Sequence, residues 1–406
     1  MKKAFFTTAI VLILVSIVTY VAVLYAKGYR LDLSKGSKLI AGTGLLVLTS
    51  TPDGARVYID ENLTTATDDT INLPPGNYEV KIEKDGYFSW KEKVIIKNEA
   101  VTKTEALLFP SAPKLEAVTL LGAQTPLVDP SGSLIAYTVN DSTPEQNGIY
   151  ILSLNSRPIL PIGTSTTQIA SDSFDTFSKA QYEFSPDGKQ LLVSVPRGKA
   201  STPSGSLNTV VYLLNTNGLN TAPKNVTVTQ NQIRTLWLTE KQTDEDKFVN
   251  GLPKKEKALA LANFSHMLIS PERDKVMYVA SVSAQMPFII NPPLPSTNST
   301  PENRMLKAGN VYVYQVKEDK NYLLYEPTDG QTLPKFLWHP SSSHLLFVKD
   351  KKIQVVEFDG GNRQTLYSGP FDGEFLYPAP DGLSVIFRTN LNDESVPSNL
   401  YRLGLK

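Results

Sequence analysis

The sequence of 406 residues contains no cysteine, which excludes disulfide bonds, thiolate metal sites and cysteine nucleophiles. Histidine is almost as scarce, with three in the whole chain. Because histidine is the commonest metal ligand and titrates near neutral pH, metal-dependent and acid–base chemistry have few donors here. Acidic and basic residues balance at 40 each, so no excess of positive charge indicates nucleic-acid binding. We expect no cofactor, no metal and no nucleic-acid partner.

Short motifs that carry catalysis are also missing from the sequence. It has no Gly-x-Ser-x-Gly nucleophile elbow, no His-Glu-x-x-His metal motif and no phosphate-binding glycine loop. His339 and His344 stand five residues apart across a predicted turn, and we interpret them as turn residues rather than metal ligands. The pair Asp68-Asp69 is interpreted as a solvated loop, with a calcium site as the alternative.

What the chain does have is a long apolar run near its N-terminus. Residues 4–26 carry no charge, and as a helix they would span ~35 Å, enough to cross the hydrocarbon core of a bilayer. A cleaved signal peptide is the alternative, but its apolar core is shorter and its cut site follows small residues. A cut after Ala26 would place Leu24 three positions back, which fits poorly. We therefore expect an uncleaved transmembrane anchor over residues 1–26.

The charges that flank this run do not decide its orientation. Basic residues lie on both sides, namely Lys2, Lys3, Lys27, Arg30, Lys35 and Lys38. Long domains are translocated largely regardless of such charges, and a short basic head before an apolar run is typical of export. We expect a single-pass protein of the cell membrane with the bulk of the chain outside the cytoplasm.

Residues 27–43 form a polar linker, and strand-like segments follow over residues 44–110. These segments are rich in β-branched and aromatic residues: LLVLTS (45–50), ARVYID (55–60), YEVKIE (78–83), KVIIK (93–97) and EALLF (105–109). Turn signals separate them, which predicts a small antiparallel β-sandwich. Strict alternation in ARVYID places Val57 and Ile59 toward the core and Arg56 and Tyr58 on the other face.

This segment resembles a PEGA domain, a small β module of bacterial surface proteins. The resemblance is carried by STPDGA (50–55) leading into VYID (57–60), by LPPGNY (73–78) and by KDGY (84–87). The name-giving Pro-Glu-Gly-Ala is Pro52-Asp53-Gly54-Ala55 here, and Glu61-Asn62 stands where a glycine commonly follows the aspartate. The resemblance implies an extracytoplasmic, non-catalytic module.

A different unit recurs over residues 111–406. It consists of a proline turn, an apolar strand and a second strand. The five turns are 129–132 (DPSG), 185–188 (SPDG), 270–273 (SPER), 339–342 (HPSS) and 379–382 (APDG). The strands after them are LIAYTV (134–139), LLVSV (191–195), VMYVA (276–280), LLFV (345–348) and VIFR (385–388). The second strands are IYIL (149–152), VVYLL (210–214), VYVY (311–314), IQVV (353–356) and LYRL (400–403).

The spacing of these units predicts a β-propeller with five or six blades. The turn prolines are 56, 85, 69 and 40 residues apart, against ~40–50 residues for a propeller blade. A degenerate blade could fill the gap of 85, with RTLWLTE (234–240) as one of its strands because it echoes KFLWHPS (335–341). Residues 111–129 and 380–406 together have the length of one blade, so we expect the two ends to share a blade and close the ring.

The repeat resembles TolB-like and dipeptidyl-peptidase-type propellers, which carry Ser-Pro-Asp-Gly turns. The turn at 270–273 is the poorest match to that pattern. Together with the anchor and the PEGA-like module, the chain resembles bacterial surface proteins. The expected fold is therefore all-β after one transmembrane helix, with a small β-sandwich followed by a five- or six-bladed propeller.

Candidate binding residues are few. The aromatic cluster Tyr87, Phe88 and Trp90 is a weak candidate for stacking on a glycan or a peptide, with packing inside the sandwich as the favoured alternative. The proline-rich insertion 286–307 and the stretch 241–262 are the best places for a partner. We expect a non-catalytic surface protein that binds a protein or a cell-wall polymer. The alternative is a hydrolase or lyase acting on envelope polysaccharide or peptide in the propeller channel.

Overall fold

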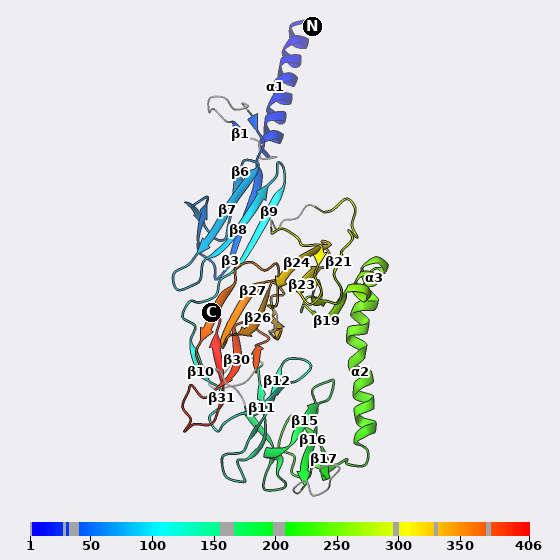
Figure 1. The fold of residues 1–406 in the computed structure, drawn as a ribbon. Helices are drawn as coiled ribbons and strands as arrows, with labels where there is room; N and C mark the ends of the chain where they lie inside the picture. The colour runs from blue at the N-terminus through cyan, green and yellow to red at the C-terminus, as the bar shows by residue number, and fades with distance from the viewer. Residues whose placement is uncertain are drawn as a thin grey trace. The chain divides into compact units, whose positions relative to one another are not determined.

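The structure, a computed structural model, describes residues 2–26, 30–31, 40–154, 166–197, 208–294, 300–328, 332–370 and 375–406. The chain divides into two compact units, residues 1–111 with 294–301 and residues 112–293 with 302–406 (Figure 1). The chain is mostly β, as the sequence predicts.

The first unit begins with helix α1 (Lys2–Ala26), which contains the apolar run. Its segment Phe6–Val23 has a mean hydropathy of 2.5, long and apolar enough to cross a membrane. A short antiparallel pair follows, β1 (Arg30–Leu31) with β2 (Ile40–Ala41). The rest of the predicted linker, at 27–29 and 32–39, lies outside the described residues.

The β-sandwich consists of a three-stranded and a four-stranded sheet. The first sheet has the order β6 (Asp69–Leu73), β3 (Gly44–Thr51), β9 (Val101–Leu107). The second has the order β5 (Asn62–Ala66), β4 (Arg56–Ile59), β7 (Gly76–Glu83), β8 (Trp90–Ile96). All pairs are antiparallel except β3 with β9, where Leu45 pairs with Val101.

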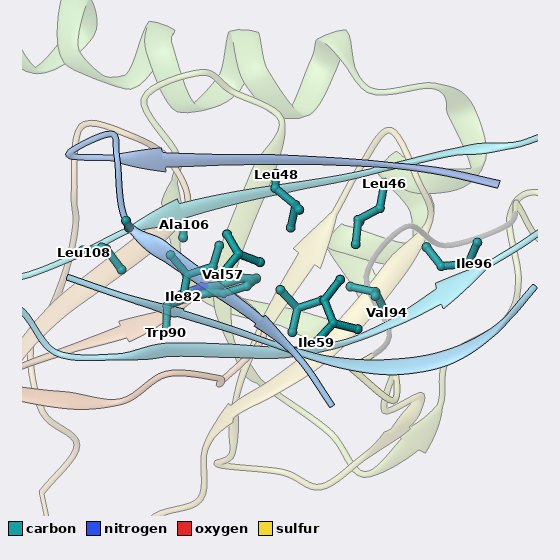
Figure 2. Packing of buried hydrophobic residues seen from close by; sticks show 12 residues of the cluster. Leu46, Leu48, Val57, Ile59, Ile82, Trp90, Val94, Ile96, Ala106 and Leu108 are labelled. Carbon is teal, nitrogen blue, oxygen red and sulfur yellow. The ribbon is translucent and has the colours of Figure 1, made fainter. Parts of the chain in front are cut away.

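One cluster of buried side chains holds the two sheets together (Figure 2). Strand β3 contributes Leu46 and Leu48, and β4 contributes Val57 and Ile59, as the alternation predicts. Arg56 is exposed, and Tyr58 is half-buried on the opposite face. The apolar area that these residues remove from water is the main stabilising term for so small a module.

The described residues of the second unit form five four-stranded antiparallel sheets that follow one another along the chain, and we number these blades 1 to 5. Blade 1 is β11 (Gln124–Val128), β12 (Leu134–Val139), β13 (Gly148–Ser153) and β14 (Thr166–Ser171). Blade 2 is β15 (Gln181–Phe184), β16 (Gln190–Arg197), β17 (Asn208–Asn215) and β18 (Lys224–Asn225), with the short 3₁₀ helix η1 (Phe177–Lys179) before it. Blade 3 is β19 (Phe264–Ile269), β20 (Lys275–Ala280), β23 (Val311–Gln315) and β24 (Lys320–Tyr325).

Blades 4 and 5 complete the set. Blade 4 is β25 (Phe336–Trp338), β26 (His344–Lys349), β27 (Lys352–Glu357) and β28 (Gln364–Ser368). Blade 5 is β29 (Leu376–Pro378), β30 (Ser384–Thr389), β31 (Asn399–Gly404) and β10 (Leu115–Ala117). Strand β10 comes from the start of the unit and pairs with β31 near the C-terminus, Leu115 opposite Leu403. The two ends therefore share a blade, as predicted, and β10 covers an edge that would otherwise be open.

The five proline turns join the first and second strands of the five blades. In each turn the fourth residue donates its backbone N–H to the carbonyl of the first, at 2.8–3.0 Å. That fourth residue is glycine with a positive φ in three turns, and Arg273 (φ 58°) or Ser342 (φ 58°) in the other two. The repeated backbone conformation explains why Pro-Asp-Gly recurs, because glycine adopts positive φ at no steric cost.

Neighbouring blades pack face to face through separate apolar clusters. One cluster joins blades 1 and 2, another blades 1 and 5, and a third blades 3 and 4. Blades 4 and 5 meet where the rings of Tyr367 and Phe387 contact each other at a tilt of 49°, with centroids 4.9 Å apart. Blades 2 and 3 are different, because each turns its remaining apolar face toward a helix.

Helices α2 (Gln230–Gly251) and α3 (Lys254–Asn263) connect blade 2 to blade 3 (Figure 1). Ile233 and Trp237 of α2 pack on Leu192 and Leu213, on the face of blade 2 opposite the blade 1 contact. Phe248 and Val249, near the other end of α2, pack against blade 3. In the described residues, these helices take the place that a sixth blade would occupy.

The prediction of a strand at 234–240 is therefore wrong. The echo of Leu-Trp suggested a blade strand, but these residues form the middle of α2. The physical reason is that Ile233 and Trp237 are four residues apart, which places both on one helical face. That face finds an apolar partner in blade 2, whereas a strand would need a neighbouring edge to pair with.

The insertion between β20 and β23 contains β21 (Ala284–Gln285) and β22 (Met305–Leu306). A buried ion network fixes its described ends to blade 3. The Arg304 guanidinium donates to Glu302 Oε2 (2.8 Å) and to the Pro287 carbonyl (2.8 Å), and lies 3.3 Å from Asp319 Oδ1. Asp319 also accepts the backbone N–H groups of Ile289 and Ile290. Residues 295–299 of this insertion lie outside the described residues.

Candidate functional site

Three adjoining pockets lie where the first strands of the blades approach one another. The helix pocket (330 Å³) is bounded by β11, by β15 and by α2 residues Arg234, Trp237 and Leu238. The central pocket (410 Å³) shares Leu127, Val128 and Pro130 with it. The lysine pocket (430 Å³) shares Lys335, Leu337 and Leu376 with the central pocket. Because each shares part of its wall with the next, we treat them as one trough.

A β-bulge in β11 shapes the middle of the trough. The register between β11 and β12 shifts between Gln124 and Leu127, and Thr125 has a positive φ of 47°. Pro126 lies inside the bulge, where its missing N–H costs no ladder hydrogen bond. The bulge leaves the Leu127 side chain 37% exposed on the wall of the trough. Bulges are common next to binding sites because they redirect a side chain.

Helix α2 forms one wall of the helix pocket, and its Arg234 makes an ion pair with β15 beside the pocket. Arg234 Nε donates to Glu183 Oε1 of β15 at 2.5 Å, and Arg234 Nη1 donates to Gln230 Oε1 at 2.7 Å. Trp237 is half-buried against blade 2, while the neighbouring Leu238 is 60% exposed. The pocket therefore presents apolar surface to solvent, with the local charges already paired.

The charge at the other end of the trough is not paired in this way. Lys335 precedes β25 and lines both the central and the lysine pocket. It is exposed, and no carboxylate in the described part of the chain lies within ion-pair distance of its ammonium group. Lys349 lines the lysine pocket too, with its ammonium 5.1 Å from the centre of the Tyr325 ring.

Tyr377 completes the wall of the central pocket. Burial, together with the nearby Asp129 carboxylate, raises the pKa of its hydroxyl. Tyr377 therefore stays protonated at neutral pH and can donate a hydrogen bond. The carboxylate of Asp129 itself is buried and accepts the backbone N–H groups of Ser131 (3.0 Å) and Leu134 (2.6 Å), so it serves the turn.

The predicted aromatic cluster does not belong to this trough. Trp90 is 5% exposed and lies among the core residues of the sandwich (Figure 2). Tyr87 is half-buried and packs against the same core. The backbone N–H of Phe88 donates to the Phe109 carbonyl at 2.9 Å, and its side chain is half-buried. These positions favour packing for Trp90 and Tyr87, and contact of Phe88 with a ligand stays a prediction.

His339 and His344 lie inside the propeller, whereas we had expected exposed turn residues. His339 is 3% and His344 2% exposed. His339 Nε2 lies 3.1 Å from the Gly382 carbonyl of blade 5, and Nδ1 accepts the Ser341 backbone N–H at 3.2 Å. Burial lowers the pKa of His339, and lowers that of His344 to about 3. Both rings are therefore neutral at pH 7, and His339 links blade 4 to blade 5 through the Gly382 carbonyl. No group of three metal-ligating side chains occurs within the described ranges.

The carboxylates of Asp68 and Asp69 are engaged locally. Asp68 Oδ1 accepts the Ser50 N–H at 3.1 Å, and Asp69 Oδ1 accepts the Thr70 N–H at 2.7 Å. The Asp69 carboxylate also bonds the Thr65 hydroxyl, and these hydrogen bonds lower its pKa. Both residues are exposed, and Asp68 lies in the bend between β5 and β6 as the loop interpretation predicts, whereas Asp69 is the first residue of β6.

Sequence reasoning missed the trough, although it placed a partner on the stretch 241–262. The trough lies just before that stretch, at residues 234–238 of α2. The available signal was the helical spacing of Ile233 and Trp237, although Leu236 and Leu238 beside Trp237 obscure it. Side chains of 241–245 lie outside the described part of α2.

Comparison with known proteins supports part of this architecture. Residues 43–111 match the PEGA domain family. The PEGA match covers the whole β-sandwich described above, from β3 to β9. None of the curated proteins matches the chain.

Among solved structures, the chain gives matches at low identity. A TolB from Agrobacterium tumefaciens is 16% identical, with a TM-score of 0.22, and the match covers 69% of this chain and 72% of that one. TolB from Acinetobacter baumannii is 12% identical, with a TM-score of 0.21 and coverage of 80% and 59%. An auxiliary nutrient binding protein from Bacteroides thetaiotaomicron is 9% identical, with a TM-score of 0.28 and coverage of 86% and 90%. The assignment of a propeller rests on the five sheets themselves.

Proposed function

We propose that this chain is a membrane-anchored, extracytoplasmic and non-catalytic surface protein. Its propeller binds a protein or a cell-envelope polymer through the trough, and the PEGA domain acts as a spacer or accessory binding module. The anchor is α1, whose length and composition suit a membrane span. The PEGA match fits an extracytoplasmic location.

The observation that carries the binding proposal is the exposed apolar surface of the helix pocket, at one end of the trough. Leu127 and Leu238 line the same pocket and are 37% and 60% exposed. Adjoining exposed apolar side chains in a concave site are costly in water and mark interaction surfaces. The trough combines them with a few placed polar groups, Lys335 and the Tyr377 hydroxyl, which is the usual composition of a binding site.

Protease treatment of intact cells tests the location. We expect the propeller to be digested in intact cells while a cytoplasmic control protein survives. A propeller that is protected until the cells are lysed would contradict the proposed orientation.

Capture of envelope components by the full chain in detergent tests the binding. We expect Leu127→Glu, inside the trough, to abolish the capture of at least one component. Leu120→Glu is the matched control, because Leu120 is 81% exposed and lines none of the three pockets. Equal capture by both variants would count against the trough.

A hydrolase or lyase in the channel stays the alternative prediction. The carboxylates that line the trough are those of Glu183, Asp129 and Asp350, and Glu183 is paired with Arg234 at 2.5 Å. Turnover of envelope polysaccharide or peptide that is lost in Glu183→Gln would favour this alternative over the binding proposal.

A further inference from the structure

The helix pocket and Lys335 lie in one continuous trough but differ in chemistry. This inference rests on the proposed function and names the ligand of the same site. We propose that the trough binds an extended peptide segment of a partner protein, with a large apolar side chain in the helix pocket and a carboxylate at Lys335.

The apolar half of this preference follows from the wall of the helix pocket. Leu127 and Val128 of β11, Phe184 of β15 and Leu238 of α2 all contribute to it. Its 330 Å³ is at the lower end of the volumes of ligand sites, which suits one large side chain rather than a whole drug-sized molecule. Aromatic and leucine side chains gain most from such burial, because the gain scales with the apolar area removed from water.

The pocket does not select a charge, because its own charges satisfy each other. Glu183 and Arg234 pair at 2.5 Å, and Arg234 donates further to Gln230. A charged ligand group there would compete with an existing ion pair. The helix pocket therefore accepts a neutral side chain flanked by polar backbone.

The acidic half of the preference follows from Lys335. Its ammonium has no carboxylate partner among the described residues, and it sits between two pockets that share it. Lys335 is exposed, and Lys349 and Asp350 line the lysine pocket with it, so the charges of this pocket sum to one positive charge. A carboxylate that reaches this point gains a charge-assisted hydrogen bond, which is stronger than one between neutral groups.

A peptide fits these two features better than an anionic polysaccharide. The two features are joined by a wall that is mostly apolar, formed by Leu127, Val128 and Pro130. A phosphate- or carboxylate-bearing glycan would need several cations along its length, and the two lysines that line the trough, Lys335 and Lys349, lie at one end only, beside Asp350. Successive side chains of an extended peptide point to opposite sides, so one peptide can place an apolar side chain in the helix pocket and a carboxylate at Lys335.

The test selects peptides rather than assuming one. A random linear peptide library displayed on phage is selected against the full chain in detergent micelles, and enriched peptides are then synthesised and titrated by calorimetry. We expect enriched sequences to share a tryptophan, phenylalanine or leucine and an aspartate or glutamate. Leu238→Ala and Lys335→Gln should each weaken the enriched peptides about fivefold or more, in keeping with about 1 kcal/mol or more per contact.

Matched controls separate the trough from general effects. Leu236→Ala removes a leucine two residues away on α2 that is 65% exposed and does not line the pocket. Lys351→Gln removes a positive charge from an exposed lysine in the turn after β26, outside the lysine pocket. Both controls should bind like the wild type. Leu238→Ala is the variant that tests the apolar preference of the helix pocket. Unlike Trp237, Leu238 does not pack on blade 2, so its truncation leaves α2 in place.

Three results would overturn the inference. The selection enriches no peptide, or the enriched peptides bind Leu238→Ala and Lys335→Gln as well as the controls, or they lack acidic residues. If the wild type still captures an envelope component in a way that Leu127→Glu abolishes, the trough is a binding site for another ligand and only this inference fails. If that capture is absent as well, the proposed function fails with it.

Discussion

The sandwich and the propeller both contain Pro-Asp-Gly, yet they use it differently. In the sandwich, residues 52–54 carry the chain from β3 in one sheet to β4 in the other, and the Gly54 N–H donates to Thr67 at 3.0 Å. In the propeller, the same tripeptide closes a hairpin within one sheet, and the Gly188 N–H donates to Ser185 at 2.9 Å. The tripeptide fixes a local turn, and the strands on either side decide what the turn connects.

The two regions also differ in where their apolar surface goes. The sandwich buries Trp90 and its other core residues in a single cluster. The propeller distributes its apolar residues over several faces, and helices cover the two faces between blades 2 and 3. Part of that helical sector remains open as the helix pocket. This difference is one reason for the proposal that the propeller binds the partner and the sandwich acts as a spacer or accessory module.

The largest expected effect tests the sandwich side of this contrast. Trp90→Ala should destabilise the sandwich by about 3–5 kcal/mol, because it removes a large buried side chain. Hydrogen exchange read separately for the two units should show the loss in residues 44–110 and leave the blades unchanged. The half-buried Phe88→Ala is the control and should cost much less. A stable Trp90→Ala variant that loses partner binding would instead support the stacking interpretation.

The ion pairs of the two regions should respond very differently to removal. Arg304→Met in the propeller should cost about 3–5 kcal/mol, because it leaves the buried Asp319 without its guanidinium. Arg56→Met in the sandwich should have no measurable effect, because its pair with Asp85 is exposed to water. Denaturant unfolding of each variant, followed by hydrogen exchange, measures both. Equal costs would contradict the assigned burial.

The shared turns should differ in their tolerance of alanine. Gly188→Ala should cost about 2–3 kcal/mol, because a Cβ there meets Asp129 Oδ2 at 2.7 Å in addition to the strain of a positive φ. At Gly54 the first neighbour is the flexible end of Lys84, at 3.7 Å, so Gly54→Ala should cost about 1 kcal/mol from φ alone. Thermal unfolding compares the two. A Gly54 variant that is the less stable one would show that the sandwich turn is the tighter.

Acid should weaken the propeller and spare the sandwich, which has no histidine. Burial lowers the pKa of His344 to about 3 in the folded state, so the unfolded chain binds more protons below its ordinary pKa of 6.5. Stability is therefore lost as pH falls, by about 1.4 kcal/mol between about pH 7.5 and about pH 5.5. Hydrogen exchange at the two pH values measures this loss.

His344→Gln supplies the control for the pH effect and should make the loss in the blades shallower. An unchanged slope would assign the acid sensitivity to other groups, His339 first, since its pKa is lowered by burial as well.

Much of the fold could be predicted because the signals were local. Alternation in residues 55–60 gave the correct face for Val57 and Ile59, and the turn repeats located the second and third strands of every blade. The prediction of a strand at 234–240 was wrong because Leu-Trp-Leu is as common in strands as in buried helical segments. Periodicity over so short a segment cannot distinguish a helix from a strand. The burial of His339 was missed because it depends on a contact with Gly382 of blade 5, 43 residues further along the chain.

The sequence by itself determined the apolar helix, the two kinds of β module and the sharing of a blade by the two ends, because periodicity, turn chemistry and length are properties of short segments. Only the tertiary structure decided what fills the space between blades 2 and 3, and where an open apolar surface remains. Those outcomes depend on contacts such as Trp237 with Leu192 and Arg234 with Glu183, between residues 45 and 51 positions apart. No local sequence pattern predicts such contacts, because the surface that each side chain packs on is assembled only when the blades have folded.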